Sequence, residues 1–333
     1  MAKSTLAVLA HIRGLILVVP WLLYLLAADI LLSLLLPFKF LFPVGVYDVS
    51  SHIASVAWRW VQYLFEAQNG AVITISGDAL PEGESAVVVA NHVAWCDFYM
   101  LQKLAIGSDM LGRCRWFAKR QLRAVPFLGW GLWALGMPLV SRNWLRDKTE
   151  LEQIFSGITE WKWPTCKLQP GLQRRARNGA HAGLLVLGLT LTGLISYSEA
   201  TRITPKKYLE SQKFCEATGR PQPQHLLYPR TKGFVATVQH LRKAPHVKAV
   251  YDVTIAYQTG MQWQQAPSFW ETLSAPALSL SGQKGGRGHR FHVHARRFLI
   301  EEMPQDDEEL AKWLEQRWVE KGQWLEEKRL EWL

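Results

Sequence analysis

The feature that most constrains the fold of this chain is an apolar run near its start, from Gly14 to Leu36. The run reads GLILVVPWLLYLLAADILLSLLL and holds a single acidic group, Asp29. A helix of about 23 residues rises ~1.5 Å per residue, which is enough to cross a hydrocarbon core of ~30 Å. The sequence therefore predicts a transmembrane helix. A cleaved signal peptide is the alternative, although the run is longer than a usual signal core and no A-x-A-like site follows it.

Asp29 and Pro37 favour a second arrangement of the same segment. A charged group at mid-membrane depth is costly unless it is paired or lies near the interface. The run can therefore form a re-entrant hairpin that breaks at Pro37, with Phe38 to Val46 returning toward the same side. Val49 to Phe65 would then lie along the surface as an amphipathic helix. In either arrangement residues 1–69 form a membrane anchor.

The composition agrees with a protein that works at a phospholipid membrane. The chain has 16 tryptophans among 333 residues, and tryptophan favours the boundary between hydrocarbon and water. A net charge of +10 suits anionic headgroups or phosphorylated substrates, whereas no zinc-finger spacing, RNA-binding motif or long basic run points to nucleic acid. The four cysteines form no C-x-x-C pair, so neither a metal site nor a disulfide framework is expected. A domain facing the reducing cytosol is the simplest interpretation.

After Gly70, short β-branched strings alternate with helical periods, which is typical of an α/β fold with a wound, mostly parallel sheet and flanking helices. This domain is expected over residues 70–300, and a charged helix over 301–333. The expected strands are Ala71–Ser76, Ala86–Ala90, Arg115–Ala118, Met137–Ser141, Ile195–Ser198, Leu226–Tyr228, Val247–Tyr257 and Arg290–Phe298. The expected helices are Phe98–Ala105, Gln121–Val125, Arg146–Trp161, Pro205–Thr218 and Thr231–Leu241.

The strongest local signal for chemistry is the segment NHVAWCD, which holds His92 and Asp97 where the apolar strand AVVVA ends. Reacting groups of α/β proteins lie at such strand ends. If His92 lies in the turn and Asp97 in the first helical turn, the carboxylate can accept the Nδ1 proton of His92. Nε2 is then left to take a proton from a substrate hydroxyl. On spacing alone, a turn or capping pair without catalysis is the competing interpretation.

Three further blocks follow this N-H-x4-D segment in order. They are Gly136-Met137-Pro138-Leu139-Val140-Ser141-Arg142, then Ser198-Glu199-Ala200-Thr201-Arg202, then Tyr228-Pro229-Arg230-Thr231-Lys232-Gly233-Phe234, which VYDVTIAY follows. Together they resemble the glycerolipid acyltransferase family, which includes 1-acylglycerol-3-phosphate acyltransferases. The last block resembles a eukaryotic branch that includes lysophosphatidylinositol and lysocardiolipin acyltransferases. The resemblance runs from the apolar segment to the C-terminal helix.

The resemblance implies roles for particular residues. It assigns catalysis to His92 and Asp97, and it implies an acyl-CoA-dependent acyltransferase that acts on a lysophosphatidic acid or lysophosphatidylinositol-like acceptor at the endoplasmic reticulum membrane. No metal or other cofactor is implied. Arginine presents a planar fork of donors that suits a phosphate. The implied substrate-binding residues are Asn91, Lys119, Arg142, Glu199, Thr201, Arg202 and Arg230, with Glu199 orienting Arg202 or binding the acceptor's glycerol.

The sequence departs from the family pattern at two positions of its third block. Ala200 stands where the family usually has glycine, and Ser198 where it often has proline. Ala200 restricts the close backbone approach that glycine permits. Two other functions compete with acyl transfer: hydrolysis of a thioester by the same two residues, and a non-catalytic membrane-binding role.

The segment from Cys166 to Gly193 differs from both of its neighbours, because its first half is basic and its second half is apolar. We hypothesise that it is translated intron sequence. Cys-Lys can be encoded TGT-AAG and Thr-Gly ACA-GGG, which would hide a GTAAG donor and a CAG acceptor. A surface loop and a second membrane-dipping hairpin are the alternatives, although Ala182 to Leu194 is too short to span a bilayer. An extra loop here is expected to displace Arg202 and to weaken activity.

Sequencing the transcript tests the intron hypothesis. The expected main spliced message lacks the codons of this segment and reads KWPTWLISYSEATR in their place. A main message that retains the segment would contradict the hypothesis. Normal turnover by the full 333-residue chain would contradict the expected loss of activity.

Overall fold

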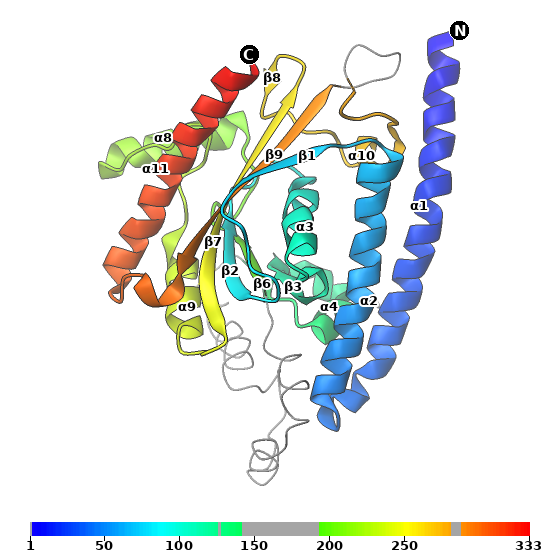
Figure 1. Ribbon diagram of the computed structural model, residues 1–333, viewed down its shortest axis with the longest axis horizontal. Coiled ribbons are helices and arrows are strands. Elements are labelled where there is room, and N and C mark those ends of the chain that lie inside the picture. Colours follow the sequence, from blue (N-terminus) through cyan, green and yellow to red (C-terminus); the bar gives the residue numbers. More distant parts are fainter. Residues whose placement is uncertain (1, 126–127, 142–192, 281–287) are drawn as a thin grey trace.

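The computed structural model describes residues 2–125, 128–141, 193–280 and 288–333. Its N-terminal part is a helical hairpin (Figure 1). Helix α1 (Ala2–Leu35) is followed by a 3-10 turn (Pro37–Phe40) and by α2 (Pro43–Tyr63), which runs back beside α1. The proline ring at Pro37 fixes φ and removes a backbone donor, so the helix ends before it. The predicted break at Pro37 is confirmed.

A mostly parallel sheet forms the centre of the α/β domain, as the alternation of strands and helices predicts. The strand order is β1-β9-β7-β2-β6-β3, and β8 pairs with β7. The β7–β9 and β7–β8 pairs are antiparallel and the others are parallel. The strands are β1 (Ile73–Gly77), β2 (Ser85–Ala90), β3 (Cys114–Trp116), β6 (Gly193–Tyr197), β7 (Val247–Thr259), β8 (Gln262–Trp263) and β9 (His289–Leu299). A second, two-stranded sheet pairs β4 (Ala118–Lys119) with β5 (Leu139–Val140).

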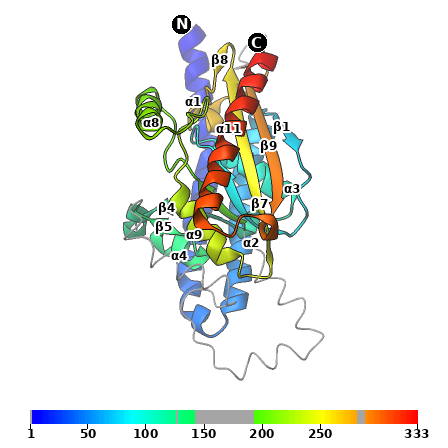
Figure 2. The same ribbon diagram turned by 90° about the vertical axis from the view of Figure 1, so that its left-hand side faces the viewer.

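Helices cover both faces of the large sheet (Figures 1 and 2). The helical hairpin and α3 lie on one face, and α9 and α11 lie on the other. Helix α8 projects from the edge of the molecule that lies away from α1. The helices after the hairpin are α3 (Asp97–Gly107), α4 (Leu128–Leu135), α8 (Pro205–Thr218), α9 (Thr231–Leu241), α10 (Glu271–Ser274) and α11 (Asp307–Trp332).

Helix α1 is held against the rest of the molecule along its length. Near its start, Arg13 donates to Asn69 Oδ1 at 2.6 Å. In its middle, the indole of Trp21 donates to a backbone carbonyl of α2 at 3.0 Å. Near its end, Asp29 lies against Gly131 of α4, where a Cβ would come within 2.3 Å of its carboxylate. The glycine is therefore needed for this close approach, and Asp29 faces protein.

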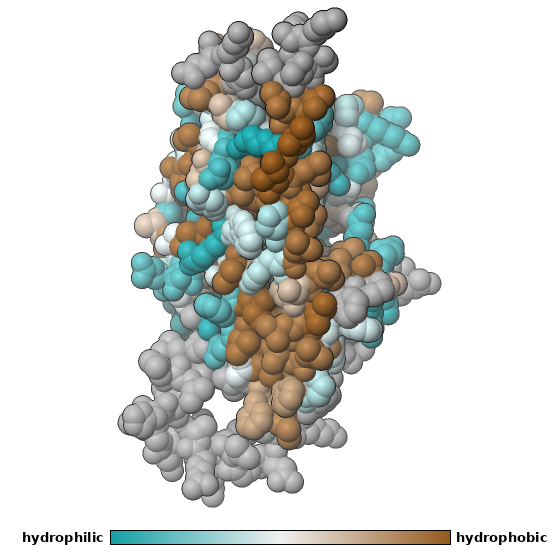
Figure 3. Space-filling model, turned by 90° about the vertical axis from the view of Figure 1, so that its right-hand side faces the viewer, coloured by the Kyte–Doolittle hydropathy of each residue, from teal (hydrophilic) through white to brown (hydrophobic). Residues whose placement is uncertain are grey.

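The opposite side of α1 exposes large apolar side chains, including Ile16, Leu23 and Leu34. Figure 3 shows a hydrophobic stripe that runs along this side of the molecule. Over Val8–Leu35, α1 is long and apolar enough to cross a membrane by length and composition. Helix α2 contacts α1 and also packs against the α/β domain, while Val49, Val56 and Tyr63 stay exposed. The expectation that Val49–Phe65 lies along a membrane surface stays a prediction.

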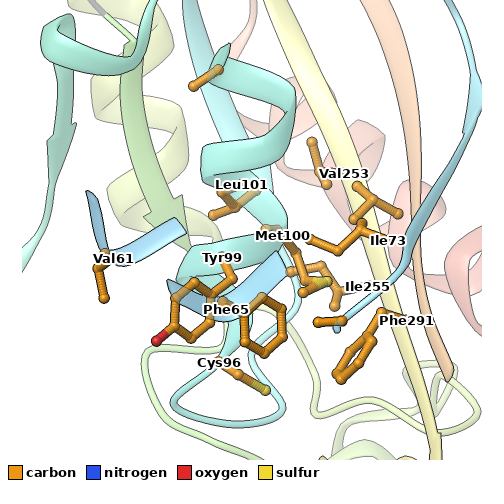
Figure 4. Packing of buried hydrophobic residues seen from close by; sticks show 14 of the residues in the cluster. Val61, Phe65, Ile73, Cys96, Tyr99, Met100, Leu101, Val253, Ile255 and Phe291 are labelled. Carbon is orange, nitrogen blue, oxygen red and sulfur yellow. The ribbon is translucent and has the colours of Figure 1, made fainter. Parts of the chain in front are cut away.

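Aromatic packing ties the hairpin to α3 and the sheet (Figure 4). The ring of Phe65, just after α2, stacks on Tyr99 of α3 with centroids 4.0 Å apart. The same ring forms a T-shaped pair with Phe291 of β9, with centroids 5.2 Å apart. These buried contacts fix the first turn of α3, which begins at Asp97. Burial of such rings is among the larger contributions to a core.

One expected strand, Leu226–Tyr228, is wrong. The segment lies between Pro223 and Pro229, which have no backbone donor for a sheet ladder. Its backbone groups form hydrogen bonds with side chains instead of with a neighbouring strand. Gln222 donates to the Leu226 carbonyl at 3.0 Å, and the Tyr228 amide donates to a serine hydroxyl at 2.9 Å. Two other expected elements are shorter or tighter: Met137–Ser141 is strand only at Leu139–Val140, and Gln121–Val125 is a 3-10 helix at Arg120–Ala124. Arg146–Trp161 and Cys166–Thr192 lie outside the described residues.

Candidate active site

The turn after β2 is fixed to the neighbouring strand by Asn91. Its amide nitrogen donates to the Ile255 carbonyl of β7 at 3.0 Å, and its amide oxygen accepts the Ile255 N–H at 2.8 Å. Asn91 is fully buried. The amide therefore replaces a missing rung of the ladder just beyond the strand end and sets the direction in which the chain leaves the sheet. This placement gives Asn91 a structural contact instead of the substrate contact that the resemblance implies.

The next residue, His92, meets Asp97 as the spacing predicts. His92 Nδ1 lies 2.7 Å from Asp97 Oδ2. The Val93 and Ala94 amides also donate to this carboxylate, at 2.8 and 3.1 Å, and the Tyr257 hydroxyl donates to its Oδ1 at 2.8 Å. So many donors stabilise the ionised carboxylate. An ionised Asp97 keeps the imidazole proton on Nδ1 and leaves Nε2 able to accept a proton.

Two tyrosines complete the surroundings of the pair. The ring of Tyr197, at the end of β6, stacks on His92 with centroids 4.1 Å apart. Burial raises the pKa of both Tyr197 and Tyr257 well above the usual value, and the charge of Asp97 raises each further. Tyr257 therefore stays a hydrogen-bond donor to the carboxylate. Sequence reasoning missed both roles, because each side chain reaches the site from a strand distant in the chain.

The loop after β6 is attached to the backbone of His92 on both sides. Glu199 Oε2 accepts the His92 amide at 3.2 Å, and the Ile203 amide donates to the His92 carbonyl at 3.0 Å. Ala200, between them, has φ = +56°, a left-handed conformation that glycine adopts without strain. The expected displacement of Arg202 by the segment from Cys166 to Gly193 stays a prediction, because residues 166–192 lie outside the described residues.

Glu199 is buried and faces inward. Besides the His92 amide, it accepts the indole N–H of Trp318 on α11 at 3.3 Å, through Oε1. Burial is the largest influence on this carboxyl group and raises its pKa to about 8. Both carboxylate oxygens thus contact the protein, which differs from the implied role in orienting Arg202 or binding the acceptor.

The basic residues of the implied substrate site that the structure describes are exposed, and two of them lie at the loop after β6. Arg202 lies on the loop itself, and Arg230 joins it through its backbone amide, which donates to the Ser198 carbonyl at 2.8 Å. Lys207 of α8, which sequence reasoning missed, donates to the Thr201 hydroxyl. Lys119 is exposed on β4, in the small second sheet, and Arg142 lies outside the described residues.

Comparison with known proteins matches two family models to the chain: "Acyltransferase" to residues 72–258 and "Acyltransferase C-terminus" to residues 284–327. Lysocardiolipin acyltransferase 1 of Gallus gallus is 25% identical over 87% of this chain and 66% of its own length. The human 1-acyl-sn-glycerol-3-phosphate acyltransferase delta is 28% identical over 73% of this chain and 53% of its own length. The chain thus spans between one half and two thirds of these relatives. The crystal structure of PlsC from Thermotoga maritima overlaps 90% of this chain and 95% of its own, with a TM-score of 0.40 and 15% identity.

Proposed function

Because the chain belongs to the acyltransferase family, we propose that it transfers a fatty acyl chain from acyl-CoA to a free hydroxyl of a lysophospholipid. The observation that carries the proposal is the 2.7 Å contact between His92 Nδ1 and Asp97 Oδ2 at the end of β2. The relatives are named for lysocardiolipin and 1-acyl-sn-glycerol-3-phosphate, and both of these acceptors are lysophospholipids with a free hydroxyl.

The proposed reaction is a direct transfer without a covalent protein intermediate. Nε2 of His92 takes the proton of the acceptor hydroxyl while that oxygen attacks the thioester carbonyl. The new C–O bond forms, the C–S bond breaks, and the CoA thiolate leaves with the proton that the imidazolium returns. Asp97 stabilises the imidazolium and keeps the ring oriented. We propose no metal and no cofactor other than the co-substrate acyl-CoA.

The acceptor phosphate is proposed to bind at the exposed cations of the loop after β6. Arg202 lies next to the residues that bond His92, and a guanidinium can hold two phosphate oxygens at once. Lys207 adds a second positive charge beside Thr201. A phosphate held there would place the acceptor's glycerol between these cations and the imidazole.

The hairpin is proposed to hold the site at one leaflet of a phospholipid membrane, and we propose that this membrane is the endoplasmic reticulum. Contacts to α2, α4 and α10 along α1 would enter the hydrocarbon if α1 crossed it, whereas the exposed stripe fits a helix that lies along the leaflet. We expect the double variant Ile16→Glu, Leu23→Glu to float with phosphatidylcholine vesicles several-fold less than the wild type. Undiminished flotation would contradict this arrangement.

Product analysis tests the proposed reaction. Purified chain in phosphatidylcholine vesicles is given labelled acyl-CoA and, one at a time, lysophosphatidic acid, lysophosphatidylinositol and lysocardiolipin. We expect labelled phospholipid with at least one acceptor, and little labelled fatty acid. Free fatty acid as the main product would identify a thioesterase instead. If none of these lipids gives an acceptor-dependent product, acyl transfer is rejected. The non-catalytic membrane-binding role would then be the remaining interpretation.

A further inference from the structure

Helix α11 reaches the back of the candidate active site through Trp318. This side chain is completely buried, and its indole N–H points at Glu199 Oε1 at 3.3 Å. The other oxygen of Glu199 accepts the His92 amide at 3.2 Å. A continuous line of hydrogen bonds therefore leads from the C-terminal helix to the backbone of the proposed catalytic base.

The position of Trp318 is fixed by its neighbour one turn along the helix. Lys321 is fully buried, its Nζ lies 2.6 Å from Asp252 Oδ1 of β7, and it also donates to the Val253 carbonyl at 2.5 Å. The same ammonium lies 4.9 Å from the centroid of the Trp318 ring, within the range of a cation–π contact. Rotation of α11 would break these contacts together, so the indole has one orientation.

We propose that Trp318 is a positioning residue, which holds Glu199 so that Glu199 fixes the backbone of His92. The inference rests on the proposed function, in which His92 is the base. A residue that served only as packing would need no N–H, and phenylalanine would fill most of the same volume. The indole instead donates to a carboxylate that is itself buried, and a buried acceptor that loses its donor is costly. The C-terminal helix thus forms part of the catalytic apparatus.

The charge of Glu199 gives this link a measurable signature. Its carboxylate accepts hydrogen bonds from the His92 amide and from Trp318, and both lower its pKa. The negative charge of Asp97 on α3 raises the pKa of Glu199, and the positive charge of Lys321 on α11 lowers it. With burial the pKa is about 8. Only the ionised form accepts both N–H groups with both oxygens, so activity is expected to rise with pH through this value.

The test compares Trp318→Phe with Trp313→Phe. The second variant is a control on the same helix, because it also replaces an indole with a phenyl ring. The ring of Trp313 stacks on Phe234, 5.7 Å away. For Trp318→Phe we expect kcat at pH 7.5 to fall about tenfold with KM for acyl-CoA unchanged. The midpoint of the pH rise should move to higher pH, because the ionised carboxylate loses a donor. Trp313→Phe should keep the wild-type profile.

Amide hydrogen exchange, followed by mass spectrometry without substrate, tests the link independently of turnover. Peptides covering residues 91–97 should exchange faster in Trp318→Phe than in the wild type or in Trp313→Phe. Wild-type exchange together with a wild-type pH profile in Trp318→Phe would overturn the inference. If the wild type transfers no acyl chain, the proposed function fails, and exchange still decides whether Trp318 holds His92. If Trp318→Phe does not fold, Glu199→Gln should accelerate the same exchange, and unchanged exchange there would also overturn the inference.

Discussion

Replacement of His92 by alanine is expected to lower the rate of acyl transfer by about three orders of magnitude, within the usual contribution of a positioned general base. The acceptor hydroxyl is a poor nucleophile while it keeps its proton. His92, the proposed base, is held in one orientation by its contacts with Asp97 and Tyr197. Binding of the two substrates should change little, so the loss should appear in kcat. The measurement is the initial rate of labelled phospholipid formation at saturating acyl-CoA.

Asp97→Asn is expected to lose about as much activity, for a different reason. An asparagine amide has only one acceptor oxygen, yet the backbone amides of Val93 and Ala94 and the imidazole Nδ1–H all donate to this side chain. The imidazole would then hold its proton on the wrong nitrogen, a change that costs about 10⁴-fold in the serine-protease triad.

The control for both variants is His52→Ala, which removes an exposed histidine of α2. It should retain the wild-type rate, and circular dichroism should show that all three variants fold. A His92→Ala protein that folds and keeps more than a tenth of the wild-type rate would remove His92 from the mechanism. If only Asp97→Asn keeps more than a tenth of the wild-type rate, a group other than Asp97 sets the tautomer of the His92 imidazole.

The pair could be predicted because its geometry is local. Five residues separate His92 from Asp97, and a strand end followed by a helix start leaves few ways to place them. The partners that complete the site are not local. Tyr257 arrives from β7 and Trp318 from α11, and nothing in the sequence around either residue shows which carboxylate its donor will meet.

Burial depends on the whole fold, and it explains why two residues have contacts that differ from their predicted roles. Asn91 and Glu199 were expected to meet substrate, but both lie inside the protein and bond the backbone of β7 and of the turn. The exposed Arg202 agrees better with its implied role. The parallel core of the sheet followed from the alternation of strands and helices, whereas the long antiparallel β7–β9 pair depends on a connection that alternation does not describe.

Replacement of Lys321 by methionine is expected to have the largest effect on stability. Lys321 and Asp252 are both completely buried and lie 2.6 Å apart. Removal of one partner leaves the other charge in a medium that solvates it poorly, a loss of about 3–5 kcal/mol in comparable pairs. Arg296 still bonds Asp252 at 2.8 Å, so we expect the lower end of this range. In a chain of this size that corresponds to a fall in melting temperature of roughly 5 °C.

Thermal unfolding in detergent, followed by circular dichroism, measures the effect of Lys321→Met. The matched control is Lys312→Met on the same helix, where the lysine pairs with Glu309 at the exposed surface. An exposed pair of this kind contributes less than about 1 kcal/mol, so the control should melt close to the wild type. The double variant Lys321→Met, Asp252→Asn should recover part of the lost stability, because it also removes the buried negative charge of Asp252. The buried pair does not hold α11 against the sheet if Lys321→Met has the same melting temperature as Lys312→Met. The same conclusion follows if Asp252→Asn lowers the melting temperature as much in the Lys321→Met background as it does in the wild type.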